Sequence, residues 1–225
     1  MSSGIFLTFE VEREKMVEFL IRCGVLHRAE VIEAFERVPR EEFVPTNLRK
    51  YAYQDTPLSI GHGQTISAPS MIAIMLESLD LEKGQKVLEI GTGSGYNAAL
   101  LAEIVGKAGR VISIERIPAI AEFGKKNLKK TGYGNVKVVV GDGTCGYEEE
   151  APWDRILITA CSPSFPQPLL DQLKIGGKIG APIGHVYSFQ VWKVAKKVGE
   201  SEVRIRDFTQ CSFVPLVGMY GWKEE

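Results

Sequence analysis

The sequence lacks several features by which large classes of protein are recognised. No apolar run approaches the roughly 18–20 residues of a membrane span, and the first residues lack the apolar core of a signal peptide. The formal net charge at pH 7 is −1, from 27 basic and 28 acidic residues, whereas a nucleic-acid-binding surface usually shows a basic excess. We therefore expect no membrane and no nucleic acid among the partners, although a local basic patch would escape this count.

Paired cysteines are missing too. The four cysteines, Cys23, Cys145, Cys161 and Cys211, form neither a CxxC pair nor a metal-ligand spacing. This usage is typical of a reduced, cytoplasmic protein whose thiols mostly fill the core, and it predicts no metal site. A disulfide between two of them stays open. The three histidines are assigned no role, because a lone histidine is more often structural or on the surface than catalytic.

Internal repeats are absent, and a regular pattern begins at Lys86. Short apolar strands alternate there with helices of about ten residues, which predicts an α/β fold with a doubly wound, mostly parallel sheet flanked by helices. The expected strands are Lys86–Ile90, Arg110–Glu115, Val136–Val140 and Arg155–Thr159, and the expected helices are Tyr96–Val105 and Ala119–Lys130. After Gly176-Gly177, the strand-like pieces Lys178–Ala181, Phe189–Val194 and Val203–Phe208 predict an antiparallel hairpin at the C-terminal edge.

The first 80 residues follow a different, mostly helical pattern. Apolar spacing predicts helices over Glu10–Cys23 and Arg28–Val38, and Pro69 suits the first turn of a third helix that runs to about Leu79. Ser67 is the expected N-cap of that third helix. Between the second and third helices, Glu42–Gly63 has no sustained period and is expected to be a long ordered loop.

A glycine-rich turn follows the strand Lys86–Ile90. Gly91, Gly93 and Gly95 occupy the first, third and fifth positions of this turn. A dinucleotide fingerprint requires glycine at the first, third and sixth positions, and here Tyr96 is the sixth. The spacing therefore favours a smaller ligand, such as an adenosyl amino acid, over a pyrophosphate at the start of the helix.

Acidic residues stand at the ends of the expected parallel strands, where ligands bind in open α/β sheets. Glu115 lies 20 residues past Gly95 and can accept hydrogen bonds from both ribose hydroxyls, or can merely face water at a strand edge. Asp142-Gly143 follows the third strand. The pair either forms an ordinary turn or lets Asp142 accept a hydrogen bond from an adenine amino group. Glu89, just before the glycine turn, either orients that turn or approaches the amino group of the ligand.

The segment Gly61–Pro69 combines two glycines, a proline and small polar side chains before the third helix. An ordinary helix start explains this composition at least as well as a binding site does. Its backbone amides nonetheless form a natural place to hold an anion such as a carboxylate.

Together, the glycine turn, Glu115 and Asp142-Gly143 resemble class I S-adenosylmethionine-dependent methyltransferases. Further motifs narrow the resemblance to the protein-L-isoaspartate O-methyltransferases, from about Val25 to Trp222. These motifs are Gly63–Pro69, Gly141-Asp142-Gly143-Thr144, Gly146-Tyr147, Ala151-Pro152-Trp153-Asp154 and Phe213-Val214-Pro215-Leu216. The resemblance implies methyl transfer from S-adenosylmethionine, which becomes S-adenosylhomocysteine, to the free α-carboxylate of L-isoaspartyl residues in damaged proteins and peptides, starting their repair.

The resemblance also assigns residues, on the positions that match the family motifs. It implies Ser67 as the catalytic residue and no metal. The implied cofactor contacts are Gln64, Thr65, Ile66, Ser67, Glu89, Gly91, Thr92, Gly93, Glu115, Arg116, Asp142 and Gly143, and the implied substrate contacts are Ser67, Ala68, Val214 and Pro215. Many relatives have histidines just after the Ala-Pro, where this chain has Ser70 and Ile72.

One methyltransferase domain, residues 1–225, is expected, and we expect it to be monomeric. Residues 1–80 would form the helical N-terminal extension and substrate loop, and residues 81–225 the cofactor-binding core and C-terminal hairpin. Three alternatives remain: a methyltransferase acting on RNA or a small molecule, a nicotinamide-dependent oxidoreductase, and a non-catalytic module that senses the cofactor.

Overall fold

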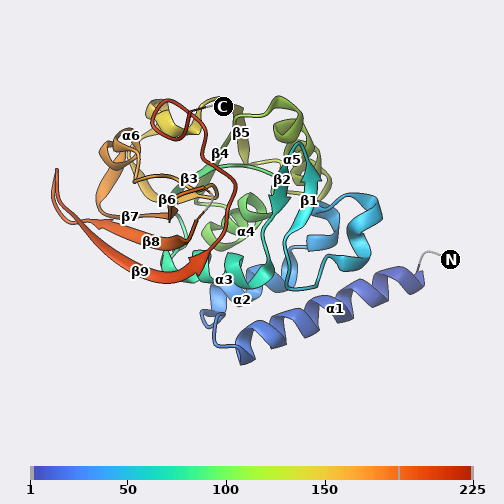
Figure 1. The fold of residues 1–225 in the computed structure, drawn as a ribbon. Helices are drawn as coiled ribbons and strands as arrows, with labels where there is room; N and C mark the ends of the chain where they lie inside the picture. Colours follow the sequence, from blue (N-terminus) through green and yellow to red (C-terminus); the bar gives the residue numbers. More distant parts are fainter. Residues whose placement is uncertain (1–2, 187, 224–225) are drawn as a thin grey trace.

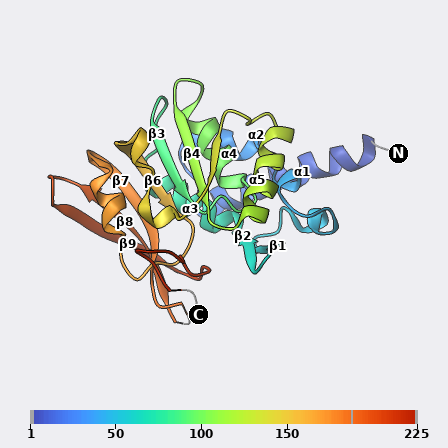
Figure 2. The same ribbon diagram turned by 90° about the horizontal axis from the view of Figure 1, so that it is seen from above.

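The structure is a computed structural model that describes residues 3–186 and 188–223. It contains a seven-stranded sheet and a separate two-stranded hairpin (Figures 1 and 2). The helices are α1 (Ser3–Arg22), α2 (Ala29–Arg37), α3 (Pro69–Ser78), α4 (Tyr96–Val105), α5 (Pro118–Lys130) and α6 (Gln167–Asp171). The strands are β1 (Leu58–Gly61) and β2 (Gln64–Ile66) in the hairpin, and β3 (Lys86–Ile90), β4 (Arg110–Glu115), β5 (Lys137–Val140), β6 (Trp153–Ile158), β7 (Leu173–Gly184), β8 (Gln190–Lys197) and β9 (Val203–Cys211) in the sheet. Four 3₁₀ helices complete the list: η1 (Arg40–Phe43), η2 (Thr46–Tyr51), η3 (Gly143–Cys145) and η4 (Glu148–Glu150).

The strand order in the sheet is β5-β4-β3-β6-β7-β8-β9. Strands β3 to β7 pair in parallel, and β8 and β9 extend the sheet in antiparallel register. The prediction of a mostly parallel α/β sheet with antiparallel strands at its C-terminal edge is thus confirmed. From β3 the chain proceeds through β4 to β5 on one side and returns through β6 and β7 on the other, so the strand order reverses beside β3. Ligands bind at such a reversal, outside the carboxyl ends of the strands.

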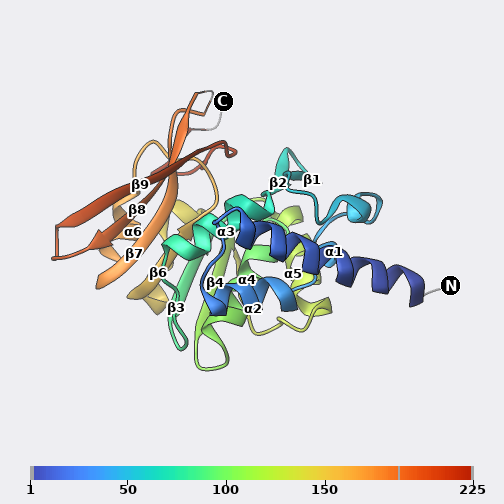
Figure 3. The same ribbon diagram turned by 90° about the horizontal axis from the view of Figure 1, so that it is seen from below.

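Alternate residues of the central strands lie in two different apolar layers, because successive side chains of a strand point to opposite faces of the sheet. Val87 and Val111 pack in one layer with side chains of α1 to α5, and Figure 3 shows several of these helices over that face. Leu88 and Ile112 pack in the other layer with Trp153, with Leu169 of α6 and with Leu216. Leu216 lies in the segment that follows β9, residues 212–223, which we call the C-terminal segment. Burial on both faces explains why these strands are apolar almost throughout.

Several predicted boundaries coincide with the structure: β3, β4 and α4 have the expected residues. The N-terminal helix begins earlier than predicted, at Ser3 rather than Glu10. The sequence predicts that the antiparallel strand-like pieces begin after Gly176-Gly177, but both glycines lie within the twelve-residue strand β7. A Cβ at Gly177 would lie 2.9 Å from the carbonyl oxygen of Asp154, so this glycine permits a close approach to β6. The five-residue helix α6 was not predicted, because its apolar pattern is too short to show a period.

The expected long loop proved more regular than predicted. Glu42–Gly63 includes the end of the 3₁₀ helix η1, the whole of η2 and the strand β1, which pairs with β2. The hairpin turns through Gly61, His62 and Gly63, all with positive φ (91°, 50° and 70°). Strands of three and four residues are too short to show an alternating pattern, so these two strands are not predicted from the sequence.

The predicted N-cap of α3 is wrong. The N-cap residue is Ala68, which makes no side-chain capping bond. The backbone amide of Ser70 instead donates to the Asp55 side chain, at 2.9 Å. A capping acid from a distant loop leaves the Ser67 side chain available for another role.

Gly180 is a point at which tight packing can be tested. A Cβ at this position of β7 would lie 2.4 Å from Cζ2 of Trp192, which is fully buried and donates its Nε1–H to the Ser78 hydroxyl. Because overpacking forces neighbours to shift, Gly180→Ala should lower the free energy of unfolding by about 1–3 kcal/mol in urea titrations. The control is Gly134→Ala, whose Cβ would meet no atom within 4 Å. It should stay within about 0.5 kcal/mol of the wild type, and equal losses in the two variants would contradict this account.

Candidate active site

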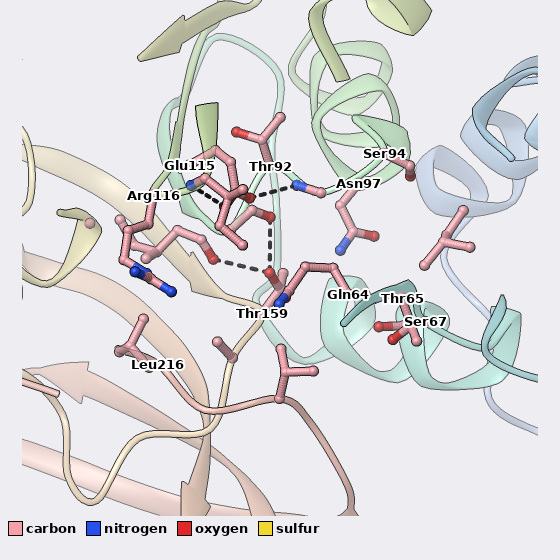
Figure 4. A pocket seen from close by; sticks show the side chains of 18 of the residues that line it. Gln64, Thr65, Ser67, Thr92, Ser94, Asn97, Glu115, Arg116, Thr159 and Leu216 are labelled. Atoms are coloured by element: carbon pink, nitrogen blue, oxygen red, sulfur yellow. Dashed lines mark hydrogen bonds between the residues drawn. The ribbon is translucent and has the colours of Figure 1, made fainter. Parts of the chain in front are cut away.

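A cleft lies beyond the carboxyl ends of the central strands, where the strand order reverses (Figure 4). The space inside it, including the part open to solvent, is about 830 Å³. Its lining comes from the hairpin side, the glycine turn, the ends of β4 and β6, and the C-terminal segment. The lining residues are Gln64, Thr65, Ile66, Ser67, Ile72, Ile90, Gly91, Thr92, Gly93, Ser94, Tyr96, Asn97, Ile114, Glu115, Arg116, Ile117, Gly143, Thr159, Ala160, Val214, Pro215, Leu216 and Val217.

The glycine turn has a backbone that side chains would not permit. Gly91, Gly93 and Gly95 all have positive φ, at 96°, 53° and 87°. A Cβ at Gly91 would also lie 2.3 Å from the Thr159 hydroxyl, which donates to the Gly91 carbonyl at 2.9 Å. The turn is thus fastened to the end of β6 while its own backbone forms one wall of the cleft. A ligand can approach that backbone closely.

Glu115 ends β4 and points toward the cleft from the side opposite the hairpin (Figure 4). Its Oε2 accepts from the amide of Gly93 at 3.1 Å, and its Oε1 accepts from the amide of Ile117 at 3.0 Å. Each carboxylate oxygen has a second lone pair, so both can still accept a ligand hydroxyl. The carboxylate is fixed in place and only 8% exposed, which suits recognition of a ribose diol.

Glu89 does not line the cleft; it is fully buried behind the glycine turn. The Ser113 hydroxyl donates to its Oε2 at 2.5 Å and also lies 2.6 Å from the Thr92 hydroxyl, and Thr92 does line the cleft. Burial raises the pKa of Glu89 to about 8, the Ser113 hydrogen bond opposes this rise, and Glu115 adds to it. The geometry favours the first alternative for Glu89, in which it orients the turn.

Asp142 lies next to the cleft, and Gly143 lines it. The Asp142 carboxylate accepts from the amide and hydroxyl of Thr144 and, at 2.7 Å, from the amide of Met219. Burial opposes ionisation, but these hydrogen bonds outweigh it and hold the pKa of Asp142 below its ordinary value. The carboxylate therefore fastens the C-terminal segment to the end of β5, a partner that the sequence did not indicate.

Gly143 requires the absence of a side chain. A Cβ there would lie 2.4 Å from Cγ2 of Ile90, so the backbone after β5 approaches the end of β3 closely. Gly143, Ile90 and Leu216 of the C-terminal segment all line the cleft.

The hairpin side supplies the opposite end of the cleft. Figure 4 shows Gln64 pointing into the cleft, with Thr65 and Ser67 at one end and Glu115 and Arg116 at the other. Ser67 is half-buried, and the described residues offer its hydroxyl no hydrogen-bond partner. This hydroxyl can therefore donate to a ligand. Val214 and Pro215 line the same cleft, whereas Ala68 does not.

Sequence reasoning missed several lining residues. Thr159 could have been found, because it ends an expected strand at the edge where ligands bind. Ser94 and Asn97 are polar residues at the glycine turn and the start of α4, and the Asn97 Oδ1 is buried without a partner among the described residues. Leu216 belongs to a family motif but was not assigned to the site, and Val217 carried no signal, since only the fold brings the C-terminal segment to the cleft.

Within the described ranges, 3–186 and 188–223, no group of three or more His, Cys, Asp and Glu side chains could hold a metal ion. No helix among these residues is long and apolar enough to cross a membrane. The four cysteines are free thiols, and burial raises the pKa of Cys161 and Cys211.

The cleft fits an adenosyl amino acid. Glu115 offers two acceptors for a ribose, Gly143 leaves room for a flat base, and the glycine turn permits close approach of the amino-acid part. At the start of α4, the Asn97 Oδ1 is buried without a hydrogen-bond partner among the described residues. With the strand order of the sheet, this cleft places the protein among the class I S-adenosylmethionine-dependent methyltransferases. Within that class, the chain belongs to the protein-L-isoaspartate(D-aspartate) O-methyltransferase family, whose model matches residues 11–221.

Individual relatives agree with this membership. A protein-L-isoaspartate O-methyltransferase of Staphylothermus marinus is 54% identical over 222 residues, covering 96% of this chain and 98% of the relative. One of Methanopyrus kandleri is 54% identical over 217 residues, covering 96% of each chain. A solved protein-L-isoaspartate O-methyltransferase structure has a TM-score of 0.84 and 35% identity, covering 93% of this chain and 67% of that one. A structure from Plasmodium falciparum assigned to this activity, in complex with S-adenosyl-L-homocysteine, has a TM-score of 0.80 and 28% identity, covering 90% and 96%.

The raised pKa of Glu89 predicts a pH-dependent stability. Between the ordinary glutamate pKa and about 8, the folded state holds a proton that the unfolded state releases, so the free energy of unfolding should fall as pH rises. Glu89→Gln carries no ionisable group there. Its stability relative to the wild type should increase by more than about 1.4 kcal/mol between pH 5 and pH 8 in urea titrations.

The matched control is Glu18→Gln, which changes an exposed glutamate on α1. Its unfolding free energy should run parallel to that of the wild type across the same pH range. If the Glu89→Gln profile ran parallel as well, the buried carboxyl would not be the cause.

Proposed function

We propose that this protein transfers a methyl group from S-adenosylmethionine to the free α-carboxylate of L-isoaspartyl residues in damaged proteins and peptides, as the first step of their repair. One observation carries the proposal. The model of the protein-L-isoaspartate(D-aspartate) O-methyltransferase family matches residues 11–221, and one cleft contains both the Glu115 carboxylate, which would bind a ribose, and the Ser67 hydroxyl, which has no partner among the described residues. Its partners would be proteins and peptides that contain isoaspartyl residues.

The proposed cofactor site runs along the cleft. Glu115 would bind the ribose and Gly143 would lie beside the adenine, with Asp142 acting through the C-terminal segment it holds. Gly91, Thr92 and Gly93 would surround the amino-acid part, and Glu89 would orient them through Ser113. The remaining proposed cofactor contacts are Gln64, Thr65, Ile66, Ser67 and Arg116. When bound, S-adenosylmethionine supplies a methyl group that is activated by the positive sulfonium.

The chain needs no general base for this reaction. An α-carboxylate has a pKa of about 3.3–3.7 and is already ionised at neutral pH. Ser67 would donate a hydrogen bond to the carboxylate and hold one of its oxygens in line with the methyl group, an arrangement that lowers the barrier by positioning. Ala68, Val214 and Pro215 would contact the peptide and exclude water from two opposite charges.

We further propose a cytoplasmic, monomeric enzyme that does not bind nucleic acid. The thiols are free and the net charge is only −1. Within this single domain, residues 1–80 would form the helical extension and substrate loop, and residues 81–225 would form the cofactor-binding core and C-terminal hairpin. One apolar core cluster includes side chains from both parts, among them Leu20 and Leu101, which supports a single domain.

The direct test is methyl transfer from radiolabelled S-adenosylmethionine to an isoaspartyl peptide, beside its aspartyl twin of the same sequence. The label should appear only on the isoaspartyl peptide and should be released by mild base, as expected of a methyl ester. Labelling of RNA or of a small molecule instead would favour the alternative methyltransferase. Equal labelling of both peptides would contradict recognition of the isoaspartyl linkage.

Two substitutions should separate cofactor binding from turnover. Glu115→Ala removes the proposed ribose acceptor and should weaken S-adenosylhomocysteine binding at least tenfold in calorimetry, about 1.4 kcal/mol. Ser67→Ala should lower kcat at least tenfold while changing that affinity less than threefold, because it removes a donor for the substrate. Unchanged affinity in the first variant, or full activity in the second, would refute the corresponding assignment.

A further inference from the structure

A buried arginine lies directly behind Ser67. Arg40 begins the 3₁₀ helix η1 and has no exposed surface. Its Nε donates to the carbonyl of Ala52 and its Nη2 to the carbonyl of Ser67, both at 2.7 Å. The guanidinium therefore ties the loop after η2 to the backbone of the serine that reaches the cleft.

This guanidinium carries a charge that no carboxylate neutralises by direct contact within the described residues. Its other contact is the ring of Tyr96, whose centroid lies 5.1 Å away. Burial lowers its pKa to about 10, against the opposing effects of Tyr96, Tyr53 and Asp55, so it stays protonated at neutral pH. A buried cation without an ion pair is unfavourable for folding, and two backbone carbonyls would not by themselves require an arginine.

The region between Arg40 and the cleft also contains polar atoms without partners. The Nη1 of Arg40, the Tyr96 hydroxyl and the Asn97 Oδ1 are all buried and unpartnered among the described residues. Tyr96 and Asn97 line the cleft, whereas Arg40 does not. The positive charge therefore lies against two residues that line the cleft, Tyr96 and Ser67.

We propose that Arg40 is a positioning residue for the substrate carboxylate. It fixes the Ser67 backbone, and it supplies a buried positive charge behind the place where that carboxylate binds. This inference rests on the proposed function. Because the carboxylate loses its charge as the methyl ester forms, a cation behind it stabilises the bound substrate more than the transition state. Loss of Arg40 should therefore affect KM for the peptide more than kcat.

A second buried arginine provides a matched control. Arg155 is 9% exposed and donates to the carbonyls of Leu79, Asp80 and Asp154, at the other end of α3. It has the same side chain, similar burial and the same kind of carbonyl partners, but it does not line the cleft or contact any residue at Ser67. Substitutions there should affect stability without affecting substrate binding.

The experiment compares Arg40→Gln and Arg40→Lys with Arg155→Gln and Arg155→Lys. Arg40→Gln should raise KM for an isoaspartyl peptide at least tenfold, lower kcat less, and leave S-adenosylhomocysteine affinity within threefold. Arg40→Lys keeps the charge and should recover part of the loss in KM. Both Arg155 variants should lower the thermal midpoint but keep KM within twofold of the wild type.

A second readout does not depend on activity. Amide hydrogen exchange over residues 64–70 should accelerate in both Arg40 variants and not in the Arg155 variants. An unchanged KM in Arg40→Gln, a lysine no better than glutamine, a parallel loss of cofactor affinity, or unchanged exchange would each overturn the proposal. If the wild type methylated no isoaspartyl peptide, the proposed function would fail, and the exchange data would still decide whether Arg40 holds Ser67.

Discussion

Close approach of backbones around the glycine turn is the constraint on which the site depends. Gly91, Gly93 and Gly95 have positive φ, and the turn lies against Thr159 at the end of β6. From the other side, a Cβ at Gly124 of α5 would lie 2.9 Å from the Gly93 carbonyl. Any side chain at these contacts would separate β3, β6 and α5, and the cleft that opens between their ends would lose its shape.

The walls of the cleft come from parts of the chain that are far apart in sequence. The hairpin β1–β2 brings Gln64 and Ser67 to one end, and the C-terminal segment brings Leu216 to the other. This segment is held by backbone bonds between Cys161 and both Val214 and Leu216, and by the amide of Met219 on Asp142. Asp142 thus fastens another segment of the chain next to the cleft.

Two fully buried ionisable side chains, Glu89 and Arg40, lie near the cleft without lining it. Glu89 is buried behind the glycine turn and Arg40 behind Ser67, so the cleft has an acidic residue behind one wall and a basic residue behind another. Two opposite charges must meet in the proposed reaction, a sulfonium and a carboxylate. Low-dielectric surroundings make distant charges count more than they would in water. Arg40, whose pKa of about 10 keeps it protonated at neutral pH, can therefore act on the carboxylate from behind Ser67, whereas the Glu89 carboxyl, with a pKa of about 8, holds its proton and carries no charge there.

The sequence by itself determined the alternating strands and helices, the glycine turn and the acids at strand ends, because these depend on local periodicity and backbone conformation. Strands β3 and β4 and helix α4 were predicted to the residue. It could not determine the β1–β2 hairpin, the carbonyl that Arg40 holds or the partner of Asp142. Those depend on which distant segments meet, and a short strand, a buried arginine and an Asp-Gly turn have the same local sequence whatever they contact. The tertiary structure decided them, since only packing of the whole chain brings residues 40, 67, 142 and 219 to one edge of the sheet.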